Sequence, residues 1–160
     1  MGDYRGTSWN SQALFASVVA TQTPKQNFLT SLAATHDFVM LQETHSTVGA
    51  METWSPPPGC RYFSSHLSQS EAGVGILVSH KFLKNFDPVP DDEDITPAIW
   101  EEIQPGRVAC LRLSGPQGNL DLMVVYLKTG HDWKARRSSR ACIAKAMRSN
   151  AAALTIIAGD

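Results

Sequence analysis

The apolar run "FVMLQ" at residues 38–42 is the sequence feature that most constrains the fold of this chain. Four consecutive apolar residues do not alternate with polar ones, so the run suits a strand that is covered on both faces. It passes directly into Glu43, and His45 stands two residues later. Either Glu43 marks the point where the strand reaches solvent, or the fold presents a carboxylate at a strand end for a function.

Two segments predict helices. In residues 23–36, Thr23 is the expected N-cap and Pro24 the expected first helical residue, because proline loses no hydrogen bond there. Residues 132–150 predict a second helix, with Asp132 as its N-cap. The side chains expected to face inward from this second helix are Ile143, Ala144 and Met147.

Several further segments have the composition of strands. Residues 106–127 predict a hairpin, because alternating apolar residues flank a turn rich in Gly, Pro and Asn. Residues 154–160 predict another buried strand, which ends on Gly-Asp. The acidic, proline-containing residues 86–97 predict a surface loop. Two more strands are expected at residues 61–66 and 72–80. This order of elements predicts a mixed α/β layered domain.

Composition places the chain among globular proteins. Its 160 residues suit one domain, and 42% are hydrophobic while 18% are charged. No run of about 18 apolar residues occurs, so no membrane span is expected. The three widely spaced cysteines fit neither a disulfide framework nor a zinc site, and no secretory signal is visible. We therefore predict reduced thiols and an intracellular location, in the nucleus or the cytoplasm.

Charge is distributed unevenly along the chain. The net charge is −1, yet seven of the fourteen basic residues lie from Lys128 onward, where the only acids are Asp132 and Asp160. This basic segment fits either a contact with a phosphate backbone or a solvated helix face.

Four short motifs resemble the endonuclease/exonuclease/phosphatase superfamily in their order and spacing. They are "SWNSQALFA" at residues 8–16, "LQETH" at 41–45, "VVYL" at 124–127 and "IIAGD" at 156–160. That superfamily includes AP endonucleases, deoxyribonuclease I and the endonuclease domains of non-LTR retrotransposons. The resemblance implies a four-layer α/β/β/α sandwich of the deoxyribonuclease I-like type. It also implies hydrolysis of phosphodiesters, with DNA as the substrate of an endonuclease and with Mg²⁺ or Mn²⁺ as cofactor.

The resemblance also assigns roles to individual residues. Glu43 matches the metal-binding carboxylate, and Asn10 matches the asparagine that orients the metal ligands and the catalytic acid. Tyr126 matches a tyrosine whose hydroxyl reaches the scissile phosphate, and Asp160 matches the acid that positions or deprotonates the attacking water. Arg107 is a further candidate for a phosphate contact. From the residues alone, a solvated strand-end Glu, a capping Asn and a core Tyr remain open.

The sequence departs from the family pattern at several positions. Gln12 stands where AP endonucleases commonly carry an acid, Ala13 replaces a glycine, and Lys128 replaces a proline. The sequence has no counterpart of the closing Asp-His pair, and no histidine matches it by position. The resemblance covers only about the first half to two-thirds of such a domain. We therefore expect residues 1–160 to be a partial domain that ends at Asp160 and is inactive alone.

Two alternatives and one physical consequence follow from these departures. The chain fits a non-catalytic remnant or a nucleic-acid-binding interaction module of the same fold, and it also fits a phosphatase of the superfamily. A partial domain is expected to leave apolar positions uncovered on the strands "FVML", "VGILV" and "LMVVYL". Such an exposed sheet face predicts self-association.

Overall fold

The computed structural model describes residues 3–88 and 98–160, which form two four-stranded sheets and four helices. The elements in chain order are β1 (Gly6–Asn10), α1 (Val19–Thr35), β2 (Phe38–Gln42), α2 (Val48–Thr53), β3 (Cys60–Ser65), β4 (Val74–Ser79), α3 (His80–Leu83), β5 (Ala98–Gln104), β6 (Val108–Gly115), β7 (Gly118–Val125), α4 (Trp133–Ala146) and β8 (Leu154–Gly159). Most of the expected surface loop at residues 86–97 lies outside the described residues.

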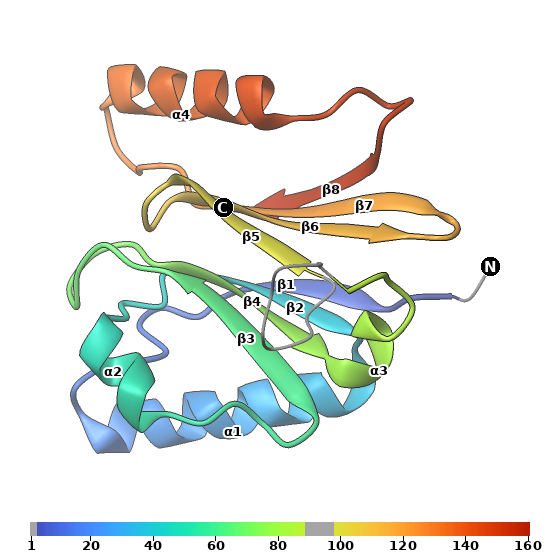
Figure 1. Cartoon of the computed structure of the whole chain (residues 1–160). Coiled ribbons are helices and arrows are strands. Elements are labelled where there is room, and N and C mark those ends of the chain that lie inside the picture. The colour runs from blue at the N-terminus through green and yellow to red at the C-terminus, as the bar shows by residue number, and fades with distance from the viewer. Residues whose placement is uncertain (1–2, 89–97) are drawn as a thin grey trace.

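The two sheets face each other, with helices on their outer sides. The strand orders are β1-β2-β4-β3 and β5-β6-β7-β8. The outer pairs β1–β2 and β7–β8 are parallel, whereas the other neighbours are antiparallel. Figure 1 shows α1 and α2 beneath the first sheet and α4 on the outer face of the second. This arrangement confirms the expected four-layer α/β/β/α sandwich.

Burial of β2 explains its uninterrupted apolar sequence. Phe38 and Met40 belong to the core between the two sheets, whereas Val39 and Leu41 pack with Leu29 of α1 on the opposite face. All five residues of β2 are buried. A strand covered on both faces carries apolar side chains on both of them, as residues 38–41 predicted, and the buried polar Gln42 forms hydrogen bonds with Ser8.

The second sheet is covered in the same way. Leu111 and Leu122 point into the core between the sheets, while Cys110 and Met123 pack against α4 through Ile143. The expectation of uncovered apolar positions on β2, β4 and β7 is therefore wrong. The facing sheet and the outer helices already cover both faces of these three strands.

Apolar exposure is found instead on β8. Leu154, Ile156 and Ile157 are 66%, 37% and 44% exposed. The predicted strand at the end of the chain is present, but the expectation that it is buried is wrong. Among the described strands β8 pairs only with β7, so it forms one edge of its sheet.

Helix α1 begins earlier than the sequence predicted. The carbonyl of Val18 accepts hydrogen bonds from the amides of Thr21 and Gln22, both at 3.0 Å, so the first turn already forms there. Thr23 is therefore not the N-cap, and Pro24 lies inside the helix. Backbone hydrogen bonds alone define this start, because Val18 forms no side-chain cap.

Helix α4 begins where it was predicted, but it faces the sheet with different residues. Asp132 caps it by accepting a hydrogen bond from the Ala135 amide at 3.0 Å. Ile143 packs against the second sheet as expected, whereas Ala144 and Met147 are exposed. Ser139 is buried instead, because its hydroxyl donates to Gln104 Oε1 of β5 at 2.7 Å. None of the helices in the described part of the chain is long and apolar enough to cross a membrane.

Candidate functional site

The ends of four strands meet at one edge of the sandwich. Asn10 is the last residue of β1, and Glu43 directly follows β2, which runs parallel to β1. Tyr126 directly follows β7, and Asp160 follows β8, which runs parallel to β7. β1 and β8, the edge strands of the two sheets, are in contact. The topology thus brings all four residues to the same end of the molecule.

Asn10 joins the two carboxylates of this site. Its Nδ2 amide group donates to Glu43 Oε1 at 3.2 Å and to Asp160 Oδ2 at 2.7 Å. Its Oδ1 atom accepts from the backbone amide of Gln12 at 3.2 Å. Both ends of the Asn10 side chain are therefore engaged, which fixes the orientation of the amide between Glu43 and Asp160.

Tyr126 completes the group from the side of β7. Burial raises the pKa of Tyr126 to about 12, and a hydrogen bond to Glu43 together with the negative charge of Glu43 adds to this rise. The positive charge of Arg107 acts in the opposite direction. The hydroxyl therefore stays protonated at neutral pH and remains a hydrogen-bond donor beside the carboxylates.

Arg107 lies next to Tyr126, but its charge is already paired. Its guanidinium carbon is 5.6 Å from the centre of the Tyr126 ring, and its Nη2 donates to Glu71 Oε1 at 2.5 Å. Its buried Nη1 has no hydrogen-bond partner among the described residues. A phosphate contact by Arg107, which stays a prediction, has to compete with Glu71. Nothing in the sequence singles out Glu71 as this partner.

The backbone around the site adopts left-handed conformations that residues other than glycine rarely take. The φ angles are 46° at Gln12, 71° at Ala13, and 50° at both Glu43 and His45. The Ala13 amide donates to the Glu43 carbonyl at 2.7 Å, so the loops after β1 and β2 hold each other in place. Ala13 stands where the resembled family carries glycine, and the left-handed conformation explains why glycine suits this position. Strained residues of this kind cluster at functional sites, which supports a functional role for Glu43.

The described histidines form no hydrogen bond with Asn10, Glu43, Tyr126 or Asp160. The most engaged of them, His66, contacts Ser46 Oγ at 2.6 Å and Ser64 Oγ at 3.1 Å. Burial lowers the pKa of His66, so the neutral imidazole is favoured there. These contacts indicate a structural histidine.

Glu43 and Asp160 are the side chains that could hold a metal at this edge. In the described part of the chain no group of three or more His, Cys, Asp or Glu side chains gathers around a common point, and neither Glu43 nor Asp160 forms an ion pair there. Mg²⁺ needs only one or two carboxylates, because water and substrate phosphate supply its other oxygen ligands. The two carboxylates therefore fit such an ion.

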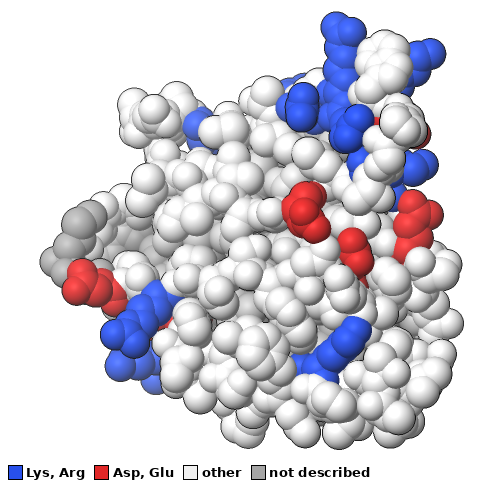
Figure 2. Space-filling view, turned by 180° about the vertical axis from the view of Figure 1, so that it is seen from behind, with Lys and Arg blue, Asp and Glu red and all other residues white. Residues whose placement is uncertain are grey.

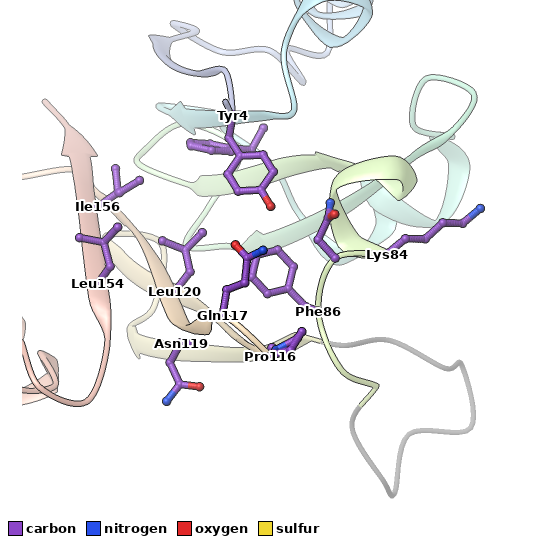
Figure 3. A pocket seen from close by; sticks show the side chains of 13 residues that line it. Tyr4, Lys84, Phe86, Pro116, Gln117, Asn119, Leu120, Leu154 and Ile156 are labelled. Atoms are coloured by element: carbon purple, nitrogen blue, oxygen red, sulfur yellow. The ribbon is translucent and has the colours of Figure 1, made fainter. Parts of the chain in front are cut away.

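A separate pocket of about 530 Å³ lies at the opposite end of the strands (Figure 3). Tyr4, Phe86, Leu120 and Leu154 contribute apolar surface, whereas the side chain of Lys84 extends away from the pocket. Its lining includes no carboxylate and no imidazole. The pocket thus lacks the carboxylate and imidazole groups that most often bind metal ions.

Comparison with known proteins identifies the fold. No family model matches the sequence, and no curated protein matches it. Among solved structures, a D. rerio TDP2 complexed with single-strand DNA product has a TM-score of 0.64 at 18% identity, over 96% of this chain and 58% of its own. The human nocturnin catalytic domain has a TM-score of 0.59 at 16% identity, and the match covers 98% of this chain and 63% of nocturnin. A mannosyl-6-phosphatase of Bacteroides thetaiotaomicron has a TM-score of 0.56 at 14% identity, and the match covers 99% of this chain and 65% of the phosphatase.

The chain spans less than two-thirds of the length of each of these three structures. Their low sequence identity limits the likeness to the fold. Together with the two facing sheets and the outer helices, it shows that the chain has the fold of the deoxyribonuclease I-like endonuclease/exonuclease/phosphatase superfamily.

Proposed function

We propose that the chain binds Mg²⁺ or Mn²⁺ through Glu43 and Asp160 and hydrolyses phosphodiester bonds, with DNA as its substrate. The observation that carries this proposal is the bridge formed by Asn10, whose one amide nitrogen donates to both carboxylates. Two carboxylates gathered on one amide group concentrate negative charge at this edge, and a cation can neutralise that charge. A divalent cation can also neutralise the charge of a phosphate during phosphoester hydrolysis.

Each side chain of the site has a role in this proposal. When bound, the metal supplies positive charge that neutralises the phosphate and lowers the barrier to attack. Glu43 and Asp160 would hold the metal, and Asn10 fixes the position of one carboxylate relative to the other through its two hydrogen bonds. Tyr126 donates a hydrogen bond from its neutral hydroxyl to a phosphate oxygen. Asp160 is exposed, so it can orient a water molecule and accept its proton.

DNA is favoured over a small phosphoester by two observations. The TDP2 structure that shares this fold was solved with a single-strand DNA product. In addition, half of the basic residues of this chain lie from Lys128 onward, where a phosphate backbone can meet them. The likeness to a mannosyl-6-phosphatase keeps a phosphatase as the nearest alternative, because one fold serves several substrates.

A second candidate function is a metal- and nucleic-acid-binding module that does not turn over its substrate. It is favoured by the absence of an imidazole bonded to the four site residues in the described part of the chain. A positioned acid or base typically contributes about 10²–10⁴-fold in rate. Even as an enzyme, the chain is therefore expected to be slow, and its activity requires a sensitive assay.

Single-turnover cleavage tests the proposal. We would incubate the protein in excess over an end-labelled single-stranded oligonucleotide, and separately with bis-p-nitrophenyl phosphate, in the presence of Mg²⁺, Mn²⁺ or EDTA. Metal-dependent cleavage that is lost in Glu43→Gln and reduced in Tyr126→Phe supports hydrolysis at this site. Glu52→Gln on the exposed face of α2 is the matched control and should cleave like wild type. Cleavage that survives both EDTA and Glu43→Gln contradicts the proposal, whereas metal binding without cleavage favours the second candidate.

A further inference from the structure

Helix α4 presents a positively charged surface in a chain whose net charge is −1. The helix contains five basic residues and no acidic residue: Lys134, Arg136, Arg137, Arg140 and Lys145. Figure 2 shows that the most prominent gathering of Lys and Arg on that side of the molecule lies over this helix. This concentration of charge is local, since the chain as a whole is nearly neutral.

An exposed tryptophan lies within this basic surface. Trp133, Arg136, Arg137 and Arg140 line one shallow hollow, as their spacing of three, four and seven residues along the helix allows. Trp133 is 57% exposed although it is the largest side chain of the helix. The Lys134 ammonium lies 5.8 Å from the centre of its ring. A large aromatic face is thus combined with the exposed side chains of Arg137 and Arg140 and with the half-buried Arg136.

An ordinary solvated helix face does not account for this arrangement. Exposed helices usually place acids three or four residues from their bases, but no residue within α4 is acidic, and its N-cap Asp132 forms its ion pair with Lys128 instead of an arginine of the helix. In the described part of the chain, none of Arg136, Arg137 and Arg140 forms an ion pair. A tryptophan usually stabilises a protein by being buried, whereas Trp133 is exposed and contributes little of that stabilisation.

Helix α4 is held firmly with this surface facing outward. Ser139 bonds to Gln104 on β5, and Ile143 packs against the second sheet. Arg112 of β6 donates to the carbonyl of Ala146, the last residue of the helix, at 2.9 Å. The inward face of α4 is therefore fixed, and the surface around Trp133 is available to a partner.

The tryptophan end of α4 also lies close to the candidate site along the chain. Residues 127–132 connect Tyr126 to Trp133, and seven residue steps span at most about 25 Å. In Figure 1 the start of α4 and the last residues of β7 lie toward the same side of the molecule. A single extended strand of nucleic acid can therefore reach both places.

We propose that this surface binds single-stranded DNA, with a base stacked on Trp133 and the flanking phosphates on Arg137 and Arg140. The aromatic ring and the guanidinium groups match the two chemical features of such a strand, because every exposed base has a π-face and every linkage has a negative charge. An acidic peptide would satisfy only the charges. The inference rests on the proposed function for its choice of DNA, and it adds a binding site outside the four residues of the candidate site.

Binding in the presence of EDTA tests this surface without any cleavage. Fluorescence anisotropy of a labelled oligothymidylate of about 15 nucleotides, within the usual range of site sizes, gives the affinity at several salt concentrations. We expect Trp133→Ala to weaken binding by about 5- to 150-fold, as loss of one stacked base does, and Trp133→Phe to restore part of it. The double variant Arg137→Ala/Arg140→Ala should reduce the slope of log K against log salt by about 1.4, because each contact with a single strand contributes about 0.7.

The double variant Lys81→Ala/Lys84→Ala is the matched control. It removes the same charge from exposed positions on and directly after α3, next to the pocket at the far end of the strands, and should leave affinity and slope unchanged. No binding by wild type, unchanged binding by the α4 variants, or tighter binding of oligouridylate than of oligothymidylate overturns the inference. Failure of metal-dependent cleavage with intact, α4-dependent binding refutes the proposed hydrolysis alone.

Discussion

Replacement of Gly159 by alanine should disturb both the second sheet and the candidate site. Gly159 pairs with Val125 of β7. A Cβ atom at Gly159 would lie against the Val125 carbonyl oxygen, 2.7 Å from its carbonyl carbon and 3.0 Å from its Cα. Relaxed carbon contacts are about 3.5–4.0 Å, so the strands must separate locally by roughly 1 Å. This shift is enough to break the 2.7 Å hydrogen bond from Asn10 to Asp160.

The expected loss of stability follows from the contacts that this shift breaks. Besides the bond to Asn10, the Leu127 amide donates to the Asp160 carbonyl at 2.7 Å and the Asp160 amide donates to the Val125 carbonyl at 3.1 Å. At about 0.5–1.5 kcal/mol for each hydrogen bond, Gly159→Ala should lower the free energy of unfolding by about 2–4 kcal/mol. For a chain of this length each kcal/mol lowers Tm by about 2–4 °C.

Urea unfolding followed by tryptophan fluorescence measures this loss. Gly49→Ala in α2 is the matched control, because no atom lies within 4 Å of an added Cβ there. Alanine is the better helix former, so the control should be neutral or more stable by up to about 1 kcal/mol. Metal titration of the same variants should show weaker binding for Gly159→Ala only. Wild-type stability and wild-type metal affinity in Gly159→Ala would refute the close strand approach and its link to Asp160.

Three further predictions follow from buried charge, titration and exposure. Asp121 is fully buried and accepts hydrogen bonds from two arginines, so Asp121→Asn should cost about 3–5 kcal/mol in urea unfolding, and a loss below about 1 kcal/mol contradicts this. Burial raises the pKa of Cys110 from 9.0 to about 12 and the pKa of Tyr126 from 10.0 to about 12. As pH rises, the unfolded chain loses these two protons before the folded chain does, so the free energy of unfolding should be unaffected below about pH 9 and should fall between about pH 9 and pH 12. Once both groups titrate, the fall should be about 2.7 kcal/mol per pH unit. A free energy of unfolding in urea that stays constant over that range contradicts the burial of these two side chains. Exposed apolar side chains on β8 should cause self-association and binding of the dye ANS. The double variant Leu154→Lys/Ile157→Lys should suppress both. A wild-type chain that sediments as a monomer would contradict this prediction.

Local patterns in the sequence were sufficient to predict the main strands and a mixed α/β layered domain, whereas the four-layer sandwich was implied by the resemblance to the superfamily. The continuous run of β2 predicted a strand covered on both faces, and the turn between β6 and β7 predicted their hairpin. Asp132 predicted the start of α4, since a capping side chain is a local signal. In each case a few adjacent residues contain all the information that the element requires.

Elements that depend on distant contacts were missed. The helices α2 and α3 have only six and four residues, too few for a periodic pattern. β5 carries two adjacent glutamates and lies at the edge of its sheet, so its sequence lacks the apolar pattern of a buried strand. It contacts the opposite sheet through Trp100, whose Nε1 donates a hydrogen bond to the Ser64 carbonyl at 3.2 Å. The exposure of β8 could not be predicted, because the burial of a strand depends on the elements that pack against it. The residues of the strand itself do not show which elements those are.

The candidate residues of the site were predicted, but their contacts were not. Asn10 meets Glu43 across 33 residues and Asp160 across 150 residues, so only the assembled sheets define this bridge. The pairing of Arg107 with Glu71 likewise requires the tertiary structure. Ala13 departs from the glycine of the resembled family, and its φ of 71° shows that this position has the left-handed conformation that glycine adopts most easily.

The central claim is that Glu43 and Asp160 hold a divalent metal, and calorimetric titration with Mg²⁺ and Mn²⁺ tests it most directly. Wild type should bind one ion per chain, weakly, because few protein ligands are present. Glu43→Gln should abolish this binding by removing one of the two carboxylates that Asn10 bridges. Glu52→Gln, which removes the same charge from an exposed position on α2, should titrate like wild type. Equal titrations for wild type and Glu43→Gln would contradict the claim.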